Sequence, residues 1–178
     1  MCLRQTTQFP TSYVVLDFET TGFSAAHDEP IQVSAIRYEQ FQETASFVTF
    51  IRPTKPVPAN ITAFTGITTE DVAHAPTIHD VFAELVNFIG KDAIVAHNAS
   101  FDLKFLEINM QKVGLPYTKF RVIDTVPLAR RYIPAANHKL PPLKSFLNLE
   151  QLPSHEAQSD CYVTSAAYQY CHRQKFGY

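Results

Sequence analysis

Apolar and polar positions alternate in short runs over the first third of the chain. Residues 13–19, 33–40 and 46–52 are rich in Val, Ile, Phe and Tyr, which is typical of β-strands. The connections between them are short, so we expect the three strands to form an antiparallel meander. Three prolines in residues 52–60, "RPTKPVPAN", then interrupt the sheet.

The apolar spacing changes to a helical period after residue 77. Apolar residues then recur three and four positions apart until Gly90 ends the pattern, and they are Ile78, Val81, Phe82, Leu85, Phe88 and Ile89. A second helix is predicted in "SFDLKFLEINMQKVG", with Ser100 as its N-cap and Gly114 as its stop. Three further helices are predicted in "TVPLARRY", "PPLKSFLNL" and "AQSDCYVTSAAYQYCHRQ". Short buried strands are predicted in "AIVAHN" and "FRVID".

A meander followed by alternating helix and strand predicts a particular α/β fold. We expect a mixed five-stranded sheet with helices on both faces. A simple Rossmann arrangement fits less well, because the first strand is followed by another strand and lacks a glycine-rich phosphate turn. The chain has 178 residues and shows no internal repeat, low-complexity segment or linker, so we expect a single domain over residues 1–178.

Composition places the chain among ordinary globular proteins. Apolar residues make up 46% and charged residues 18%. No apolar run approaches the length of a membrane span, and the N-terminal residues lack the apolar stretch of a signal peptide. We therefore expect a cytoplasmic protein without a membrane partner. Cys161 and Cys171 are ten positions apart in a predicted helix. That is about 15 Å along the axis, too far for a disulfide.

Basic residues are concentrated in residues 112–144, although the net charge of the chain is −2. This segment holds seven basic residues and one acid, Asp124, with Tyr117, Phe120 and Tyr132 interleaved. It is either a phosphate-binding arm or a solvated surface of helices and loops, and the pattern alone does not decide between the two.

The first predicted strand ends in two acids, Asp17 and Glu19, within "VVLDFETTG". Residues two apart in a strand share a face and lie roughly 6.5–7 Å apart, so Phe18 points to the opposite layer. Two carboxylates that close repel each other unless a cation lies between them. The alternative is a strand end that has reached solvent.

Two further acids stand at predicted helix starts. Asp102 falls in the first turn of a helix, where amide groups stabilise a carboxylate, although helix-start acids are common. Asp160 precedes Val163, Thr164 and Ala167 by three, four and seven residues, so it shares their inward stripe. A carboxylate on a buried face needs a partner, and a metal ion is a good one.

His155 precedes Asp160 by five residues. On one continuous helix the two would lie about 140° apart, so we expect His155 in the loop that enters the helix, within reach of the same site. Sites of several carboxylates favour hard cations such as Mg²⁺ or Mn²⁺. A histidine beside such a site is a candidate base for water, and otherwise a structural or solvated residue.

Three segments together resemble the motifs of the DEDD exonucleases, in the histidine-bearing branch: "DFETTG", "HNASFD" and "HEAQSD". That branch includes the epsilon proofreading subunit of the bacterial replicative DNA polymerase, ribonuclease T and oligoribonuclease. The similarity runs from about Tyr13 to Tyr170, and the segments "ITAFTGIT" and "VIDTVPLAR" are most similar to the epsilon subunit and related polymerase-associated domains.

The resemblance implies a ribonuclease H-like fold and metal-dependent 3′→5′ removal of nucleotides as nucleoside 5′-monophosphates. It implies that Asp17, Glu19, Asp102 and Asp160 bind two divalent ions, Mg²⁺ or Mn²⁺, and that His155 is the general base. Asp17 would bridge both ions, with Glu19 and Asp160 completing one and Asp102 supporting the other. Two metals about 4 Å apart can clamp the attacking and leaving oxygens of a phosphoryl displacement.

The resemblance also points to residues that meet the substrate. Thr20 and Thr21 follow the acids where family members meet the terminal 3′-hydroxyl. Asn98, Phe64 and Phe101 are candidates to border the last base and sugar, with core packing as the alternative for the two phenylalanines. Single-stranded or frayed DNA is the expected substrate. RNA is the alternative, since sugar discrimination depends on a few contacts to the 2′ position.

Two alternatives to a stand-alone enzyme are an inactive binding module and a domain that works with a polymerase. An inactive nuclease fold used as a binding module predicts the loss of a catalytic position, whereas all five are present. The epsilon subunit continues past this domain into a tail with clamp- and polymerase-binding segments, whereas this chain ends about 18 residues after Asp160. The resemblance therefore leaves association with a polymerase open.

Overall fold

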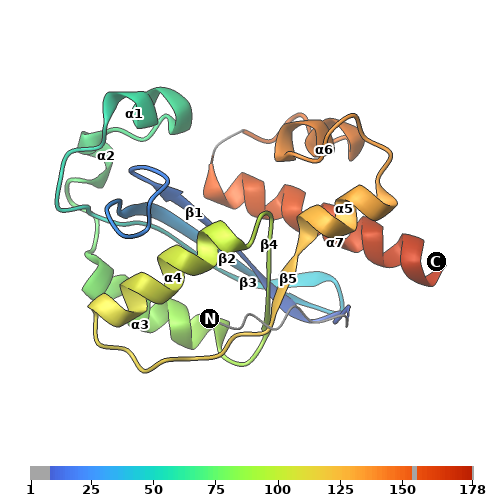
Figure 1. Cartoon of the computed structure of the whole chain (residues 1–178), viewed down its shortest axis with the longest axis horizontal. Coiled ribbons are helices and arrows are strands. Elements are labelled where there is room, and N and C mark those ends of the chain that lie inside the picture. The colour runs from blue at the N-terminus through green and yellow to red at the C-terminus, as the bar shows by residue number, and fades with distance from the viewer. Residues whose placement is uncertain (1–8, 154–155, 178) are drawn as a thin grey trace.

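A single five-stranded sheet organises the molecule, for which the computed structural model describes residues 9–153 and 156–177 (Figure 1). The strands are β1 (Tyr13–Thr20), β2 (Pro30–Glu39), β3 (Gln42–Phe50), β4 (Ala93–Ala96) and β5 (Val122–Asp124). Their order is β3-β2-β1-β4-β5. The first three are antiparallel, and β4 and β5 run parallel to β1. This confirms the predicted mixed sheet, with β2 and β3 each starting earlier than expected.

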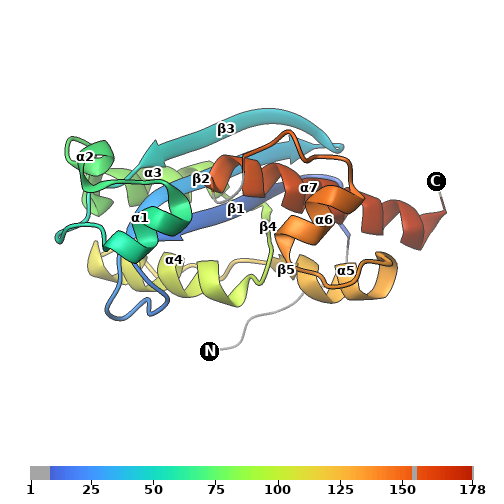
Figure 2. The ribbon, with the colours of Figure 1, turned by 90° about the horizontal axis from the view of Figure 1, so that it is seen from above.

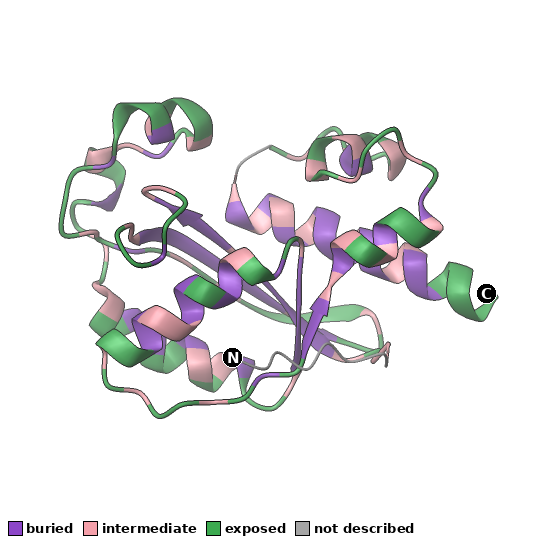
Figure 3. Cartoon of the chain, in the orientation of Figure 1, coloured by how far each residue is buried: buried purple, intermediate pink, exposed green. Residues whose placement is uncertain are grey.

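Helices cover both faces of the sheet (Figures 1 and 2). On one face lie α3 (Ile78–Ile89) and α4 (Ser100–Lys112), which share a core with β1, β2 and β4. On the other lies the long helix α7 (Ala157–Phe176), against which α5 (Thr125–Tyr132) and α6 (Leu140–Phe146) pack. Figure 3 shows β1, β2 and β4 buried between these layers, whereas β3 at the edge of the sheet is mostly exposed.

The alternation along β1 decides which layer each of its side chains enters. Even-numbered positions face α3 and α4, and the ring of Phe18 stacks on that of Phe82 with their centroids 6.1 Å apart. Odd-numbered positions face α7, as the contact between Tyr13 and Tyr168 shows. Asp17 and Glu19 therefore point toward α7 at the end of the strand, and the prediction that Phe18 enters the opposite layer is confirmed.

Two short helices were missed by the sequence pattern. They are α1 (Ala59–Thr65) and α2 (Thr69–Val72). Each is under two turns long, so a helical period cannot be seen in it. Their apolar residues pack into a small cluster with Ile31 of β2 and Val57. The clustering, together with a capping box between Thr68 and Asp71, stabilises a segment whose prolines predicted only a break.

The structure also tests the predicted N-cap of α4 and the predicted absence of a bond between two cysteines. Ser100 is the first residue of α4 and Ala99 is its N-cap, so the prediction of Ser100 as a side-chain cap is wrong. Cys161 and Cys171 are buried and free, as their spacing predicted. Within the described ranges, no helix has the length and apolar character of a membrane span.

Candidate active site

Three acids converge where β1 ends against the start of α7. Asp17 and Glu19 come from β1 and Asp160 from the first turn of α7, and one ligand oxygen from each lies within 4.8 Å of the others. The start of α7 is held to the sheet, because the amide of Ala157 donates a hydrogen bond to Oε1 of Gln32, 3.2 Å away. Packing of α7 on the odd-numbered face of β1 thus brings together acids more than 140 residues apart in sequence.

Asp102 reaches the same pocket from the other layer. It stands in the first turn of α4, is 2% exposed, and its Oδ1 accepts a hydrogen bond from the amide of Phe18 at 3.1 Å. The pocket has a volume of about 170 Å³ and is lined by Asp102 and the other three acids. All four acids singled out in the sequence are therefore gathered at one site. His155 lies outside the described residues.

The acids of the pocket are buried carboxyl groups that repel one another, and both effects raise their pKa values. Burial first, and then repulsion by Asp102, Asp160 and Glu19, raises the pKa of Asp17 well above its ordinary value. Burial and repulsion by Asp160 raise the pKa of Glu19 to about 7.

The other two acids are shifted in the same direction. Burial raises the pKa of Asp102 to about 8, against the lowering effect of the hydrogen bond from Phe18. Burial also raises the pKa of Asp160 to about 6, against the lowering effect of the Lys144 ammonium. Burial and repulsion between the acids therefore favour the protonated form of Asp17 and Asp102 at neutral pH.

This donor set fits a divalent metal ion. The ligands are all carboxylate oxygens, which hard cations such as Mg²⁺ and Mn²⁺ prefer. A cation among Asp17, Glu19 and Asp160 would replace the protons that the raised pKa values otherwise favour. The acids come from three packed elements, β1, α4 and α7, and their arrangement is consistent with metal binding.

The comparison with known proteins decides the family. The model of the exonuclease family that includes ribonuclease T matches residues 14–168, which is most of the chain. The chain belongs to this exonuclease family. The family is that of the DEDD exonucleases, which are phosphodiester hydrolases.

Individual relatives agree with this assignment. The exonuclease is 38% identical over 154 residues to the PolC-type DNA polymerase III of Bacillus cereus, covering 86% of this chain but 11% of the polymerase. Among solved structures, Exonuclease X in complex with 5′-overhanging duplex DNA is 25% identical, with a TM-score of 0.67 over 93% of both chains. E. coli Exonuclease I in complex with a dA16 oligonucleotide has a TM-score of 0.82 at 18% identity, covering 93% of this chain and 42% of that one, which shows a shared fold.

Four of the predicted substrate residues line the pocket of this exonuclease beside the acids: Thr20, Phe64, Asn98 and Phe101. Phe64 is 54% exposed, so the alternative of core packing is wrong for it. Phe101 is half-buried and packs against the rings of Phe105 and Phe23, so it serves the core and the pocket wall together.

Thr21 is placed differently from Thr20. Its hydroxyl accepts a hydrogen bond from the amide of Glu29 at 2.9 Å, which closes the loop after β1, and it is not among the residues that line the pocket. The same loop depends on Gly22, because a Cβ there would lie 2.5 Å from the side chain of Asp28. A contact of Thr21 with substrate stays a prediction.

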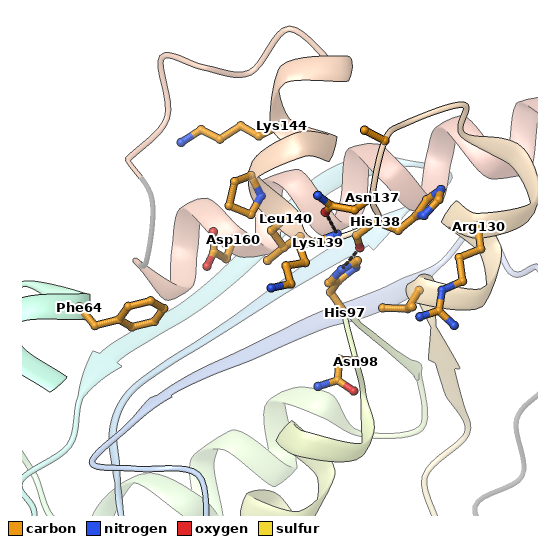
Figure 4. A pocket seen from close by; sticks show the side chains of 13 residues that line it. Phe64, His97, Asn98, Arg130, Asn137, His138, Lys139, Leu140, Lys144 and Asp160 are labelled. Carbon is orange, nitrogen blue, oxygen red and sulfur yellow. Dashed lines mark hydrogen bonds between the residues drawn. The ribbon is translucent and has the colours of Figure 1, made fainter. Parts of the chain in front are cut away.

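The sequence reasoning missed His97, which lines the pocket one residue before Asn98. Its Nε2 donates a hydrogen bond to the carbonyl oxygen of His138 at 2.8 Å (Figure 4). Its Nδ1 lies 2.8 Å from the hydroxyl of Thr125. His97 thus joins the end of β4 to α5 and to the connection between α5 and α6. The clue in the sequence was the position of His97 within "AHN", directly before Asn98. Its hydrogen-bond partners are brought close by the tertiary fold.

Proposed function

We propose that this exonuclease domain, residues 1–178, removes nucleotides from the 3′ end of single-stranded or frayed DNA and releases nucleoside 5′-monophosphates. The observation that carries the proposal is the meeting of Asp17, Glu19, Asp102 and Asp160 in one pocket. The relatives support DNA as the substrate, since one is a DNA polymerase and two solved structures hold DNA.

The four acids are the residues that would bind divalent cations. Asp17, Glu19 and Asp160 would hold one divalent ion, and Asp17 with Asp102 a second, with Mg²⁺ or Mn²⁺ as the ions. When bound, such ions polarise a phosphoryl oxygen and lower the pKa of water. Oδ1 of Asp102 accepts a hydrogen bond from the amide of Phe18, which fixes the side chain in place beside the other acids.

Proton transfer and substrate placement fall to neighbouring residues. His155, assigned from the sequence motif "HEAQSD", takes the proton from the attacking water, and the 3′-oxygen of the penultimate nucleotide is the leaving group. Thr20 and Thr21 meet the terminal 3′-hydroxyl. Phe64 and Phe101 offer aromatic faces that accept any base, with Asn98 beside them.

RNA is the second candidate substrate, since nothing in the pocket geometry alone excludes a 2′-hydroxyl. Association with a polymerase is a further proposal. It is supported by the PolC-type relatives, of whose length the chain spans about a tenth.

One incubation series tests the proposed function. Single-stranded DNA, duplex DNA and RNA of one sequence, each labelled at the 5′ end, are incubated with Mg²⁺, Mn²⁺ or EDTA. We expect a 3′-shortening ladder that requires metal and is fastest on single-stranded DNA. An Asp17→Asn variant is the control for contaminating nucleases. A ladder that persists in EDTA would overturn the metal requirement. A faster ladder on RNA would overturn the assignment of DNA as the substrate.

A further inference from the structure

A second and larger cavity adjoins the acid pocket. It has a volume of about 900 Å³, and its walls come from α5, the connection between α5 and α6, and α6 (Figure 4). We call it the basic groove, because Arg130, His138, Lys139 and Lys144 line it and Asp160 is the acid among its lining residues. The acid pocket is several times smaller, at about 170 Å³, so a strand whose last nucleotide fills that pocket extends beyond it.

The basic groove is continuous with the acid pocket. Phe64, His97, Asn98 and Asp160 line both cavities. A polymer with its end at the carboxylates therefore passes into the groove without crossing a wall. A strand with its 3′ end at the carboxylates would have its next nucleotides beside the groove.

The cations in the groove differ in how accessible they are. Arg130 and Lys139 are exposed and belong to the groove lining. Lys144 is 7% exposed, and its ammonium donates hydrogen bonds to the carbonyl oxygens of Leu152 and Pro153, so it adds to the field without being a surface contact. Arg131, next in sequence to Arg130, does not line the groove and holds its guanidinium over the ring of Tyr132.

The connection that carries Lys139 is fixed in place. His97 holds the carbonyl of His138, the residue before Lys139, and His138 in turn bonds through Nε2 to the carbonyl of Ile133 at 3.0 Å. Burial lowers the pKa of His97, which favours the neutral ring that this bridge uses. Lys139 is therefore presented to the groove by an ordered segment bonded to the end of β4.

We propose that the basic groove binds the phosphates of the strand on the 5′ side of the cleaved nucleotide, with Arg130 and Lys139 as the contacts. This inference rests on the proposed function. It divides the basic segment of residues 112–144 into a part that meets nucleic acid and a part that is solvated surface. Cationic contacts to phosphate predict a gain in affinity with strand length that weakens as salt rises.

The test compares substrate length in two double variants. One is Arg130→Gln with Lys139→Gln, and its matched control is Lys119→Gln with Arg131→Gln, which removes the same charge from outside the groove. The ratio of kcat/KM for (dT)8 to that for (dT)2 is measured with Mn²⁺. We expect the groove variant to lower this ratio by at least roughly tenfold, the effect of losing one charge-assisted hydrogen bond. The control should keep the wild-type ratio.

A binding measurement separates this proposal from the proposed function. In an Asp17→Asn background, the affinity for 5′-fluorescein-labelled (dT)8 is followed by anisotropy from 50 to 300 mM salt. The groove variant should flatten the salt slope and the control should not. If the groove variant flattens the salt slope but the wild type shows no hydrolysis, the groove proposal stands and the proposed exonuclease activity is overturned. Hydrolysis with an unchanged length ratio and salt slope would overturn the groove alone.

Discussion

The backbone amide of Phe18 donates a hydrogen bond to Oδ1 of Asp102, 84 residues further along the chain and 3.1 Å away. The amide belongs to the residue between Asp17 and Glu19, so the bond locks the first turn of α4 to the part of β1 that carries two of the other acids. Asp102 has two tasks in consequence. It satisfies a buried amide, and it lines the acid pocket.

The two tasks of Asp102 can be separated by substitution. Asp102→Asn keeps an oxygen that can accept from Phe18, whereas Asp102→Ala leaves that amide without its partner. We expect both variants to lose most activity, and the Ala variant to be less stable than the Asn variant by about 1–3 kcal/mol, the cost of an unsatisfied buried group. Urea unfolding in EDTA measures the difference. Equal free energies of unfolding in the two variants would show that this hydrogen bond does not stabilise the fold.

Asp17 is the central acid of the pocket in electrostatic terms, because all three of the other acids repel it. We expect Asp17→Ala to abolish turnover while the protein stays folded, as judged by circular dichroism. Glu84→Ala, which removes an exposed acid from α3, is the matched control and should keep normal activity. Near-normal hydrolysis by a folded Asp17→Ala protein would exclude the assigned site.

Stability should depend on pH in a direction set by the acids. The pKa values of Glu19 and Asp102 are raised to about 7 and about 8, whereas unfolded carboxyl groups titrate near 4. The folded state therefore binds more protons than the unfolded state up to about pH 8, so the free energy of unfolding falls as pH rises. The opposite effect of His97, whose pKa is lowered, fades above pH 6.5, because the unfolded imidazole then loses its proton.

Thermal unfolding from pH 6.5 to 8.5 checks this dependence. In EDTA, Tm should decrease with pH. Added Mg²⁺ or Mn²⁺ should raise Tm, and raise it most at the alkaline end, because the cation then replaces protons that have been lost. The slope in EDTA should be shallower in Asp102→Asn, which has one acid fewer. A Tm in EDTA that rises through this window would contradict the raised pKa values.

His155 should differ from the acids in its effect. If it is the base and not an essential ligand, His155→Ala should lose roughly 10²–10⁴ in turnover, the usual contribution of a positioned general base. Its metal affinity by calorimetry should stay close to that of the wild type, whereas Asp160→Ala should lose metal. The wild-type single-turnover rate should rise with pH as the imidazole deprotonates, and that limb should vanish in His155→Ala. Equal loss of metal in both variants would make the histidine a ligand.

Local pattern was enough to predict the core of the site. Alternation in β1 put Asp17 and Glu19 on one face and Phe18 on the other, and helical spacing put Asp160 on the inward stripe of α7. These predictions succeed because each depends on the geometry of one element. The joining of those elements at one pocket was implied by the motifs and not by the spacing.

What the sequence did not predict depends on contacts between elements. α1 and α2 are too short to show a period, and packing against Ile31 stabilises them. The exposure of Phe64 follows from the placement of α1, and the bridge made by His97 needs partners 28 and 41 residues away. In each case the decisive partner is distant in sequence, so no local pattern carries the information.

Helix α7 begins at the acids and leads away from them. Asp160 lies in its first turn and Phe176 is its last residue, so the two ends are about 24 Å apart along the axis. A surface, bead or fluorophore attached after α7 would therefore stand well clear of the carboxylates (Figure 1). Anchored in this way, a single molecule would keep the anchor away from its acid pocket, so that the shortening of one strand could be followed in real time.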